Sequence, residues 1–443
     1  MMDGSCFTQH RSKLLEMFRT NFNVTSGIIF YESPDQPKEP YSNSELPFLQ
    51  EALFYWVSGW SNPDSAITID IESGHTILYI PSYDEHYEIW TGPIPTNQSI
   101  IDQTGVNEVR FTKQYLDDVM SYVQKKIKLY SSSASNKNSM KCDNEIFVQA
   151  AGMARIEKLP HEISNIRTAA EKTGKALVES MKNCKPGLHE YDIETMFEYY
   201  GARLGCRNVS FKTIVGSGQH AVYLHYTAND GLIKDGDLVL VDCGLFENHY
   251  AGDITRTFPA SGKFSPDQAL VYNLLLEKQI ELIRMVKPGL TFQQLNGEMF
   301  KSIMAILESL GIASSEGLDK EKMLTVARLF CPHSLTHNVG CNVHDLVYNT
   351  TEKDKWKAST LLRPGMVITA EPGIYFHKVR LERERNNPNY ACVNFDKALH
   401  YADTVGGIRI EDDLLVTEDG SEVLSCNCPK TIEEIEKIMS STN

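Results

Sequence analysis

The chain has 443 residues, of which 42% are hydrophobic and 23% charged, a composition typical of globular proteins and unlike that of disordered chains. This length exceeds what one hydrophobic core usually supports, so about two domains are expected. The net charge of −15 argues against nucleic acid as a partner, because phosphate binding depends on clustered Lys and Arg. No apolar run reaches the ~20 residues that a membrane-spanning helix needs, so no membrane association is expected.

The cysteines and the first residues of the chain indicate a cytoplasmic protein. Ten cysteines are scattered without paired spacing, which is typical of reduced thiols rather than of a disulfide framework. Residues 1–22 carry several charged side chains and lack the apolar core of a signal peptide. We therefore expect a cytoplasmic location.

The first third of the chain predicts a smaller, mixed α/β domain over residues 1–158. Residues 27–31 and 54–60 are short apolar runs of strand length, and residues 66–80 alternate apolar and polar side chains around a central turn, as in a hairpin. Thr112 can cap an amphipathic helix that follows it.

Residues 159–443 contain a pattern that occurs twice. A predicted helix ends at Lys-Pro-Gly-Leu in residues 185–188, and about a hundred residues later another ends at the same tetrapeptide in residues 287–290. Each half then contains an apolar strand that ends in a carboxylate, Asp242 in the first and Glu371 in the second. A buried carboxylate is costly unless a cation balances it. The pattern predicts a duplicated α/β unit whose strands meet at one pseudo-symmetric site.

Two further carboxylates belong to the same pattern. Asp253 lies on a predicted returning strand, and a hairpin can bring it beside Asp242. In the second half, strand alternation places Arg409 and Glu411 on one face. Asp413 shares that face, so spacing alone does not choose between Glu411 and Asp413.

Histidines between the two halves complete the candidate site. Residues 333–345 contain His333, His337 and His344, a density that is unusual for a packed core. Carboxylates with an imidazole form a hard, oxygen-rich site suited to Mn²⁺, Co²⁺ or Zn²⁺. Bridging carboxylates can hold two such ions ~3.5–4 Å apart. One strand-end Asp or one His is usually a turn or core residue, whereas the combination predicts a two-metal hydrolase.

At these positions the sequence resembles the metallopeptidase family of prolidase, aminopeptidase P and methionine aminopeptidase. The matching motifs are residues 241–244 (VDCG), 252–259 (GDITRTFP), 333–337 (HSLTH), 343–345 (VHD), 371–375 (EPGIY) and 409–413 (RIEDD). The resemblance implies a pita-bread catalytic domain over residues 159–443 with an internal pseudo-two-fold duplication. It also implies that residues 1–158 form the creatinase/aminopeptidase P-like domain that precedes the catalytic domain in prolidase and aminopeptidase P.

The resemblance assigns the metals and the proton transfer. It implies two divalent ions, with Mn²⁺ expected and Co²⁺ or Zn²⁺ suitable, bound to Asp242, Asp253, His337, Glu371 and Glu411. A hydroxide that bridges the ions would attack the peptide bond. Glu371 would also move a proton towards the leaving nitrogen.

The resemblance also assigns the residues that contact the substrate. It implies that His225 and His333 line the substrate pocket and that His344 stabilises the tetrahedral oxyanion. Arg409 would orient Glu411 as a partner behind the metal ligands.

Within this family we expect a prolidase, which hydrolyses Xaa-Pro dipeptides and releases the carboxy-terminal proline. Residues 377–404 resemble an insertion of animal-type prolidases, and Trp90 resembles a tryptophan that in those enzymes reaches the neighbouring subunit's active site. This resemblance implies a homodimer. Lys357 stands where such prolidases have the arginine that binds the dipeptide carboxylate, although Lys355 could take this role. Lysine keeps the charge but loses the bidentate fork, which weakens the expected preference for dipeptides.

Four alternatives are considered. A creatinase-like enzyme shares the fold but not the metal ligands, so the complete ligand set argues against it. Aminopeptidase P would remove the first residue from longer Xaa-Pro peptides. Methionine aminopeptidases commonly lack the amino-terminal domain, which disfavours them. A catalytically inactive binding module of the same fold is the alternative from another class, but such proteins lose metal ligands and this chain has all five.

Overall fold

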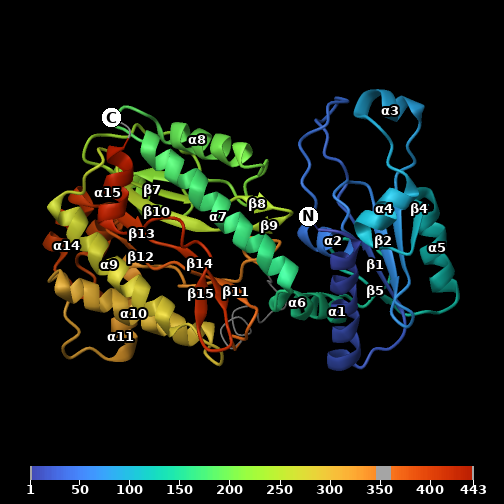
Figure 1. Cartoon of the computed structure of the whole chain (residues 1–443). Helices are drawn as coiled ribbons and strands as arrows, with labels where there is room; N and C mark the ends of the chain where they lie inside the picture. The colour runs from blue at the N-terminus through green and yellow to red at the C-terminus, as the bar shows by residue number, and fades with distance from the viewer. Residues whose placement is uncertain (1, 346–360, 442–443) are drawn as a thin grey trace. The chain divides into compact units, whose positions relative to one another are not determined.

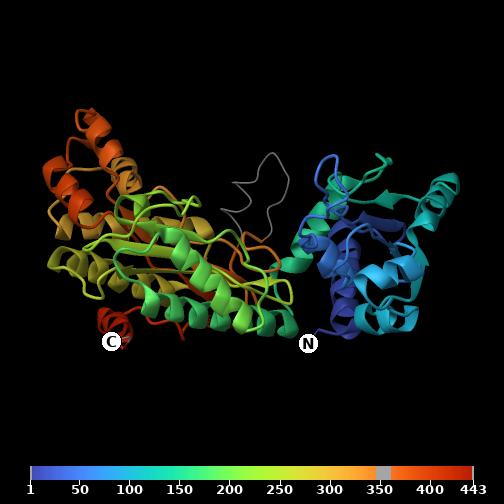
Figure 2. The same ribbon diagram turned by 90° about the horizontal axis from the view of Figure 1, so that it is seen from above.

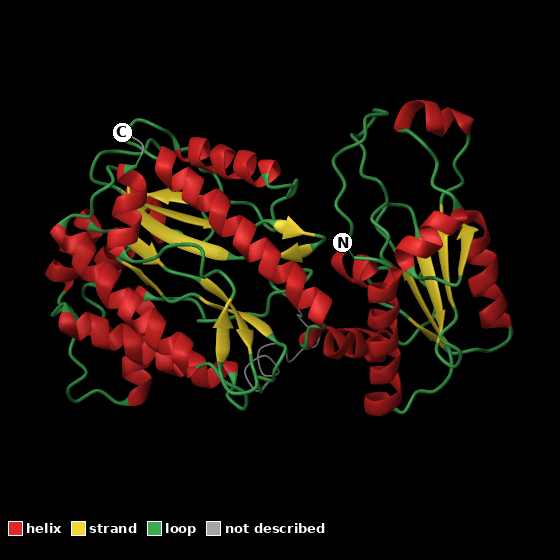
Figure 3. Ribbon diagram, in the orientation of Figure 1, coloured by secondary structure: helices red, strands yellow, loops and turns green. Residues whose placement is uncertain are grey.

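The computed structural model describes residues 2–345 and 361–441. They divide into an amino-terminal unit within residues 2–156 and a carboxy-terminal unit within residues 157–345 and 361–441 (Figure 1). Each unit contains both helices and strands (Figure 3), so the mixed α/β class predicted from the sequence is confirmed.

The amino-terminal unit is built on a five-stranded sheet of order β4-β3-β2-β1-β5. Its inner pairs, β1–β2 and β2–β3, are antiparallel, whereas β4 and β5 join the two edges in parallel. The strands are β1 (Ile28–Glu32), β2 (Ala66–Asp70), β3 (Thr76–Ile80), β4 (Glu108–Phe111) and β5 (Leu129–Tyr130). The helices are α1 (Gly4–Phe22), α2 (Ala52–Ser58), α3 (Glu85–Thr91), α4 (Asn97–Thr104), α5 (Thr112–Gln124) and α6 (Asn144–Ile156).

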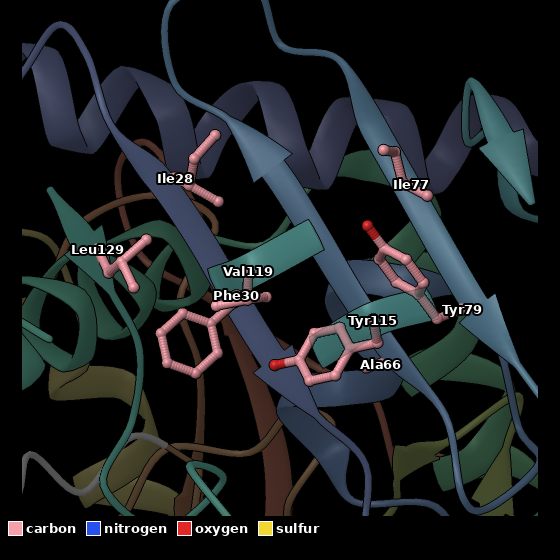
Figure 4. Close-up of a cluster of buried hydrophobic side chains, with 8 residues drawn as sticks. All are labelled: Ile28, Phe30, Ala66, Ile77, Tyr79, Tyr115, Val119 and Leu129. Carbon is pink, nitrogen blue, oxygen red and sulfur yellow. The ribbon is translucent and has the colours of Figure 1, made fainter. Parts of the chain in front are cut away.

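Helix α5 covers one face of this sheet. Its side chains Tyr115 and Val119 pack with residues of four strands in one buried cluster (Figure 4). The other members of the cluster are Ile28, Phe30, Ala66, Ile77, Tyr79 and Leu129. The predicted hairpin over residues 66–80 is present as β2 and β3. The predicted helix is present as α5, but Phe111 rather than Thr112 occupies its cap position.

One predicted element of this unit is wrong. Residues 54–60 do not form a strand, because most of them belong to helix α2. The carboxylate of Glu51 accepts hydrogen bonds from the backbone N–H groups of Leu53 (2.9 Å) and Phe54 (2.7 Å) and thereby caps the helix. Gly59, with a φ of 72°, ends it. The run is apolar on nearly all sides, so its helical period is invisible in the sequence.

The carboxy-terminal unit has two halves that follow the same plan. The first half contains α7 (Pro160–Asn183), α8 (Glu190–Arg203), β6 (Ile214–Ser217), η1 (Gly218–Val222), β7 (Leu238–Cys243), β8 (Phe246–Glu247), β9 (Tyr250–Ala251) and β10 (Ile254–Pro259). The second contains α9 (Pro266–Met285), α10 (Phe292–Ser309), α11 (Lys320–Phe330), β11 (Val367–Ala370), β12 (Gly373–Tyr375), α13 (Lys378–Glu384), η2 (Pro388–Tyr390), α14 (Phe395–Thr404), β13 (Gly407–Arg409), β14 (Asp412–Val416), β15 (Ser421–Val423) and α15 (Ile432–Ser440).

The predicted duplication is visible in matching backbone bonds of the two halves. The N–H of Gly187 donates to the carbonyl of Ile233, and the N–H of Gly289 donates to that of Leu362, each at 2.9 Å. Both glycines have left-handed φ values, 93° and 87°, which explains why glycine stands in each copy of the tetrapeptide. Each copy therefore ends one helix and places the next one in the same way.

The strands of this unit form two three-stranded sheets, β10-β7-β6 and β11-β14-β15, together with the pairs β12-β13 and β8-β9. Helix α7 contacts β10, α8 contacts β6, and α9 contacts β11. In the view of Figure 2 the strands of this unit lie among these helices. Strand β13 also contacts β7 and β10, so the strands of the two halves meet.

Candidate active site

A cavity of about 540 Å³ lies in the carboxy-terminal unit, where the strands of the two halves meet. Nine predicted site residues line it: His225, Asp242, Asp253, His333, His337, His344, Glu371, Arg409 and Glu411. Two predicted residues are not part of this group. Lys357, like the alternative Lys355, lies outside the described residues. Trp90 belongs to α3 of the amino-terminal unit, where its side chain is 76% exposed.

A tight turn brings the two aspartates of the first half together. Asn248 and His249, between β8 and β9, both have positive φ values, 48° and 63°, as in a two-residue primed hairpin turn. The chain returns along β10, which pairs with β7 so that Cys243 lies opposite Ile254. Asp242 and Asp253 therefore lie next to this pair, and both are buried.

The glutamates of the second half lie where the chain passes between two sheets. Glu371 separates β11 from β12, and Glu411 separates β13 from β14. Because β12 pairs with β13 and β11 with β14, both breaks fall at the same level. Asp413, the alternative to Glu411, accepts a hydrogen bond from the backbone N–H of Asp253 (2.9 Å) and does not line the cavity.

Three of the candidate ligands form a cluster that could hold a metal ion. Ligand atoms of Asp253, His337 and Glu411 lie within 4.8 Å of one another. The Nε2 atom of His337 is 3.4 Å from Oδ2 of Asp253 and 3.8 Å from Oε1 of Glu371. Its Nδ1 atom lies 3.1 Å from the carbonyl of Asn338, and donation there leaves the lone pair of Nε2 facing the carboxylates.

The charges at this cluster are unbalanced without a cation. Burial and the charges of Asp242 and Glu371 raise the pKa of Asp253 well above its usual range. Burial and the charges of Asp253 and Asp242 do the same for the pKa of Glu411. Oδ1 of Asp242 is buried without a hydrogen-bond partner in the part of the chain that the structure describes. Oxygen donors with one imidazole therefore fit hard or borderline divalent cations, which would relieve this repulsion.

Arg409 ties the ligands to their surroundings through its three nitrogen atoms. Nη2 donates to Oδ2 of Asp242 (2.7 Å), and Nε donates to Oγ1 of Thr255 (3.1 Å). The hydroxyl of Thr255 in turn donates to Oε2 of Glu411 (2.6 Å). Arg409 therefore contacts Asp242 directly and reaches Glu411 through Thr255, a residue to which sequence reasoning assigned no role.

Tyr375 links Arg409 to a histidine of the pocket. Its hydroxyl accepts from Nη1 of Arg409 (2.8 Å) and lies 2.9 Å from Nε2 of His333. Burial, together with the charge of Arg409, lowers the pKa of His333 to about 4. His333 is therefore neutral near pH 7: its Nδ1 donates to the carbonyl of Ser334 (2.9 Å), and its Nε2 accepts from Tyr375. The sequence shows Tyr375 only as part of a motif.

The other two pocket histidines, His225 and His344, are exposed. The rings of His337 and His344 meet edge to face, with centroids 4.3 Å apart. His225 is exposed and lies in the segment between η1 and β7. Both side chains line the cavity.

A buried carboxylate holds the segment that carries His225. Glu190, on α8, is fully buried and accepts hydrogen bonds from the backbone N–H groups of Ser217 (2.7 Å) and Gly231 (2.7 Å). It also accepts from the hydroxyl of Ser217 (2.8 Å), and Nδ1 of His220 lies 3.0 Å away. These partners flank the segment on both sides. The sequence contains no signal for this role, because an acidic residue in a first helical turn is common.

The fold and the site define a metallopeptidase. Residues 164–418 match the description "Metallopeptidase family M24", and residues 7–130 match "Aminopeptidase P, N-terminal domain". The chain belongs to metallopeptidase family M24. No helix in the described ranges is long and apolar enough to cross a membrane.

Proteins with two different names are similar to this chain along nearly its whole length. The Xaa-Pro dipeptidase of Homo sapiens is 31% identical over 463 residues, an alignment that covers 98% of this chain and 93% of the human protein. The Xaa-Pro aminopeptidase of Escherichia coli is 30% identical over 460 residues, with 98% and 97% covered. Among solved structures, zinc-substituted E. coli aminopeptidase P in complex with product has a TM-score of 0.81 at 28% identity and covers 99% of this chain and 98% of its own.

Proposed function

We propose that the chain hydrolyses the peptide bond in front of proline and that free Xaa-Pro dipeptides are its preferred substrates. The observation that carries this proposal is the convergence of four carboxylates and the imidazole of His337 on one cavity. The relatives named above act, by their names, on Xaa-Pro substrates. The tertiary amide before proline has no N–H, so a site that binds the substrate carbonyl suits this bond.

Five residues would hold the metals. We assign Asp242, Asp253, His337, Glu371 and Glu411 as ligands of two divalent ions, Mn²⁺ being the ion we expect and Co²⁺ or Zn²⁺ also suiting these donors. When bound, such ions polarise a carbonyl and lower the pKa of a water molecule from ~16 towards ~7.

The chain's own residues would bind the substrate and move the proton. Glu371 would accept a proton and pass it to the leaving nitrogen of proline. His344, whose ring meets that of His337 edge to face, would donate a hydrogen bond to the oxygen of the attacked carbonyl. His225 and His333 would line the pocket beside the substrate. His333, being neutral near pH 7, would add no charge there.

The preference for dipeptides rests on the amino-terminal unit and on residues 377–404. The latter form α13, η2 and α14, and Trp90 is mostly exposed to solvent. We propose that the protein is a cytoplasmic homodimer in which Trp90 limits substrate length and Lys357 binds the dipeptide carboxylate. Aminopeptidase activity on longer Xaa-Pro peptides is the second candidate, because the E. coli enzyme that bears that name matches the whole chain equally well.

The test is turnover by the purified chain after removal of metal and addition of Mn²⁺. Release of amino acids from Ala-Pro and from Ala-Pro-Ala-Ala is followed in parallel. Cleavage of Ala-Pro with little cleavage of the tetrapeptide is expected, whereas the reverse preference identifies an aminopeptidase. Asp253→Asn should abolish both reactions, while the same change at the exposed Asp235 should abolish neither. Unchanged turnover by Asp253→Asn would remove the metal assignment.

A further inference from the structure

A second groove of about 700 Å³ adjoins the active-site cavity. Its walls are the facing sides of α10 and α11, and it shares His333 and Ser334 with the cavity. Asn296 of α10 fixes this shared wall, because its side-chain oxygen accepts a hydrogen bond from the backbone N–H of Leu335 (2.7 Å). The groove is therefore continuous with the place where the substrate is expected to bind.

The groove is basic in a protein whose net charge is −15. Lys301, Lys320, Arg328 and Arg380 line it, and none of its described lining residues is acidic. Lys301 pairs with Glu298 (2.7 Å). Within residues 2–345 and 361–441 the other three cations form no salt bridge, although the charge of Arg380 acts on the carboxylate of Glu384. Their charge is available to an anion that enters the groove.

The remaining lining suits an extended peptide. Apolar side chains of both helices, including Phe300, Met304 and Leu324, provide surface for side chains of a ligand. The guanidinium of Arg328 lies over the ring of Phe300, 5.4 Å from its centroid, which orients this cation at the groove wall. Gln293 adds an amide that can bind a peptide backbone.

Charge decides which end of a peptide enters the groove. An exopeptidase that removes one residue from the amino end leaves only that residue, with its cationic amino group, on the amino side of the cleaved bond. Three unpaired cations would repel this group. All further length of a substrate lies on the carboxyl side and ends in an anion, which the groove attracts.

We propose that this groove binds the carboxy-terminal tail of substrates that continue past proline and selects acidic tails. The inference rests on the second candidate function, hydrolysis of longer Xaa-Pro peptides, and specifies their class: acidic peptides of the form Xaa-Pro followed by several residues. Lys320, Arg328 and Arg380 determine this specificity.

The experiment compares kcat/KM of the Mn²⁺-loaded enzyme for Ala-Pro, Ala-Pro-Ala-Glu-Glu and Ala-Pro-Ala-Lys-Lys. The acidic pentapeptide should exceed the basic one by about tenfold at low salt, since each of several solvated charge pairs contributes a small factor. This difference should shrink towards about twofold in about 0.5 M NaCl, because salt screens exposed charges.

Two substitutions on one helix provide a matched comparison. Lys320→Gln should lower the ratio of acidic to basic pentapeptide turnover about threefold, and adding Arg328→Gln should lower it further. Lys322→Gln removes the same charge from the same helix but at a position that does not line the groove, so it should leave the ratio unchanged. Circular dichroism of each variant verifies that it is folded.

The outcomes separate this inference from the proposed function. Failure to cleave any of the three peptides with Mn²⁺, Co²⁺ or Zn²⁺ would overturn the Xaa-Pro assignment itself. Cleavage of Ala-Pro with no cleavage of either pentapeptide would overturn only the groove proposal. Equal turnover of the two pentapeptides, or equal effects of Lys320→Gln and Lys322→Gln, would overturn it as well.

Discussion

Replacing Glu190 by glutamine tests whether one buried carboxylate holds the segment that carries His225. Both carboxylate oxygens accept hydrogen bonds, and their donors include the backbone N–H groups of Ser217 and Gly231 at 2.7 Å. A glutamine keeps one acceptor and replaces the other by an NH₂ group, which is itself a donor. At least one backbone N–H would then face a donor in a fully buried position.

The size of the effect follows from these contacts. A hydrogen bond to a charged group contributes ~1.5–3 kcal/mol, and an unpaired buried donor adds a penalty of similar size. We expect local opening of residues 214–231 to become easier by ~3 kcal/mol, which corresponds to about a hundredfold faster amide exchange. Turnover of Ala-Pro should fall by about ten- to a hundredfold, because a side chain displaced by about 1 Å loses its productive geometry.

Hydrogen exchange read by mass spectrometry measures the first effect, and steady-state kinetics measures the second. Glu198→Gln is the matched control, since Glu198 lies on the same helix with an exposed side chain. That variant should exchange and react like the parent, within ~0.5 kcal/mol. If Glu190→Gln behaves like Glu198→Gln in both measurements, Glu190 does not hold this segment.

Three other perturbations have defined outcomes. Asp253→Asn should raise the melting temperature of the metal-free protein, because it removes repulsion with Glu411. It should also suppress the further increase in melting temperature expected on addition of Mn²⁺. Scanning fluorimetry with and without Mn²⁺ measures both, and an Mn²⁺-dependent increase that persists in the variant would contradict the prediction. Tyr375→Phe should lower kcat/KM about 10–100-fold, because His333 and Arg409 lose the hydroxyl that both contact. A kcat/KM equal to that of the parent would refute this. Burial lowers the pKa of His249 to about 4, so the unfolded chain takes up a proton before the native one as pH falls below about 6.5. Between about pH 8 and about pH 5 the parent should therefore lose ~2 kcal/mol of unfolding free energy that the variant His249→Asn keeps, asparagine being suited to the positive φ. Urea unfolding at both pH values measures this, and an equal pH dependence of parent and variant would exclude it.

The duplication and the candidate ligands could be predicted because both are written in short, local patterns. The glycines at 187 and 289 need left-handed backbone, and so they mark the helix ends in both halves. Asp242 and Glu371 stand out because a charged residue at the end of an apolar strand is unusual without a partner. Such signals need no knowledge of distant residues.

The rest depends on contacts between residues far apart in the sequence. Glu190 looks like an ordinary helix-start acid until the partners Ser217 and Gly231 are known. Spacing does not separate Glu411 from Asp413. Of the two, only Glu411 lines the cavity, because it lies at the break between β13 and β14, which strand alternation does not reveal. Residues 54–60 resemble a strand in the sequence for a related reason: burial on all sides hides helical periodicity.

The division of the carboxylates between the two halves has a consequence for how the protein is made. Asp242 and Asp253 come from the first half, whereas Glu371 and Glu411 come from the second, and strand β13 meets β7 and β10 only when both halves are present. During synthesis, the first half leaves the ribosome long before residue 411 does. The complete cluster therefore cannot form before the two halves have docked on each other. Metal uptake at the site proposed above would therefore report, in a refolding experiment, the moment at which the two halves dock.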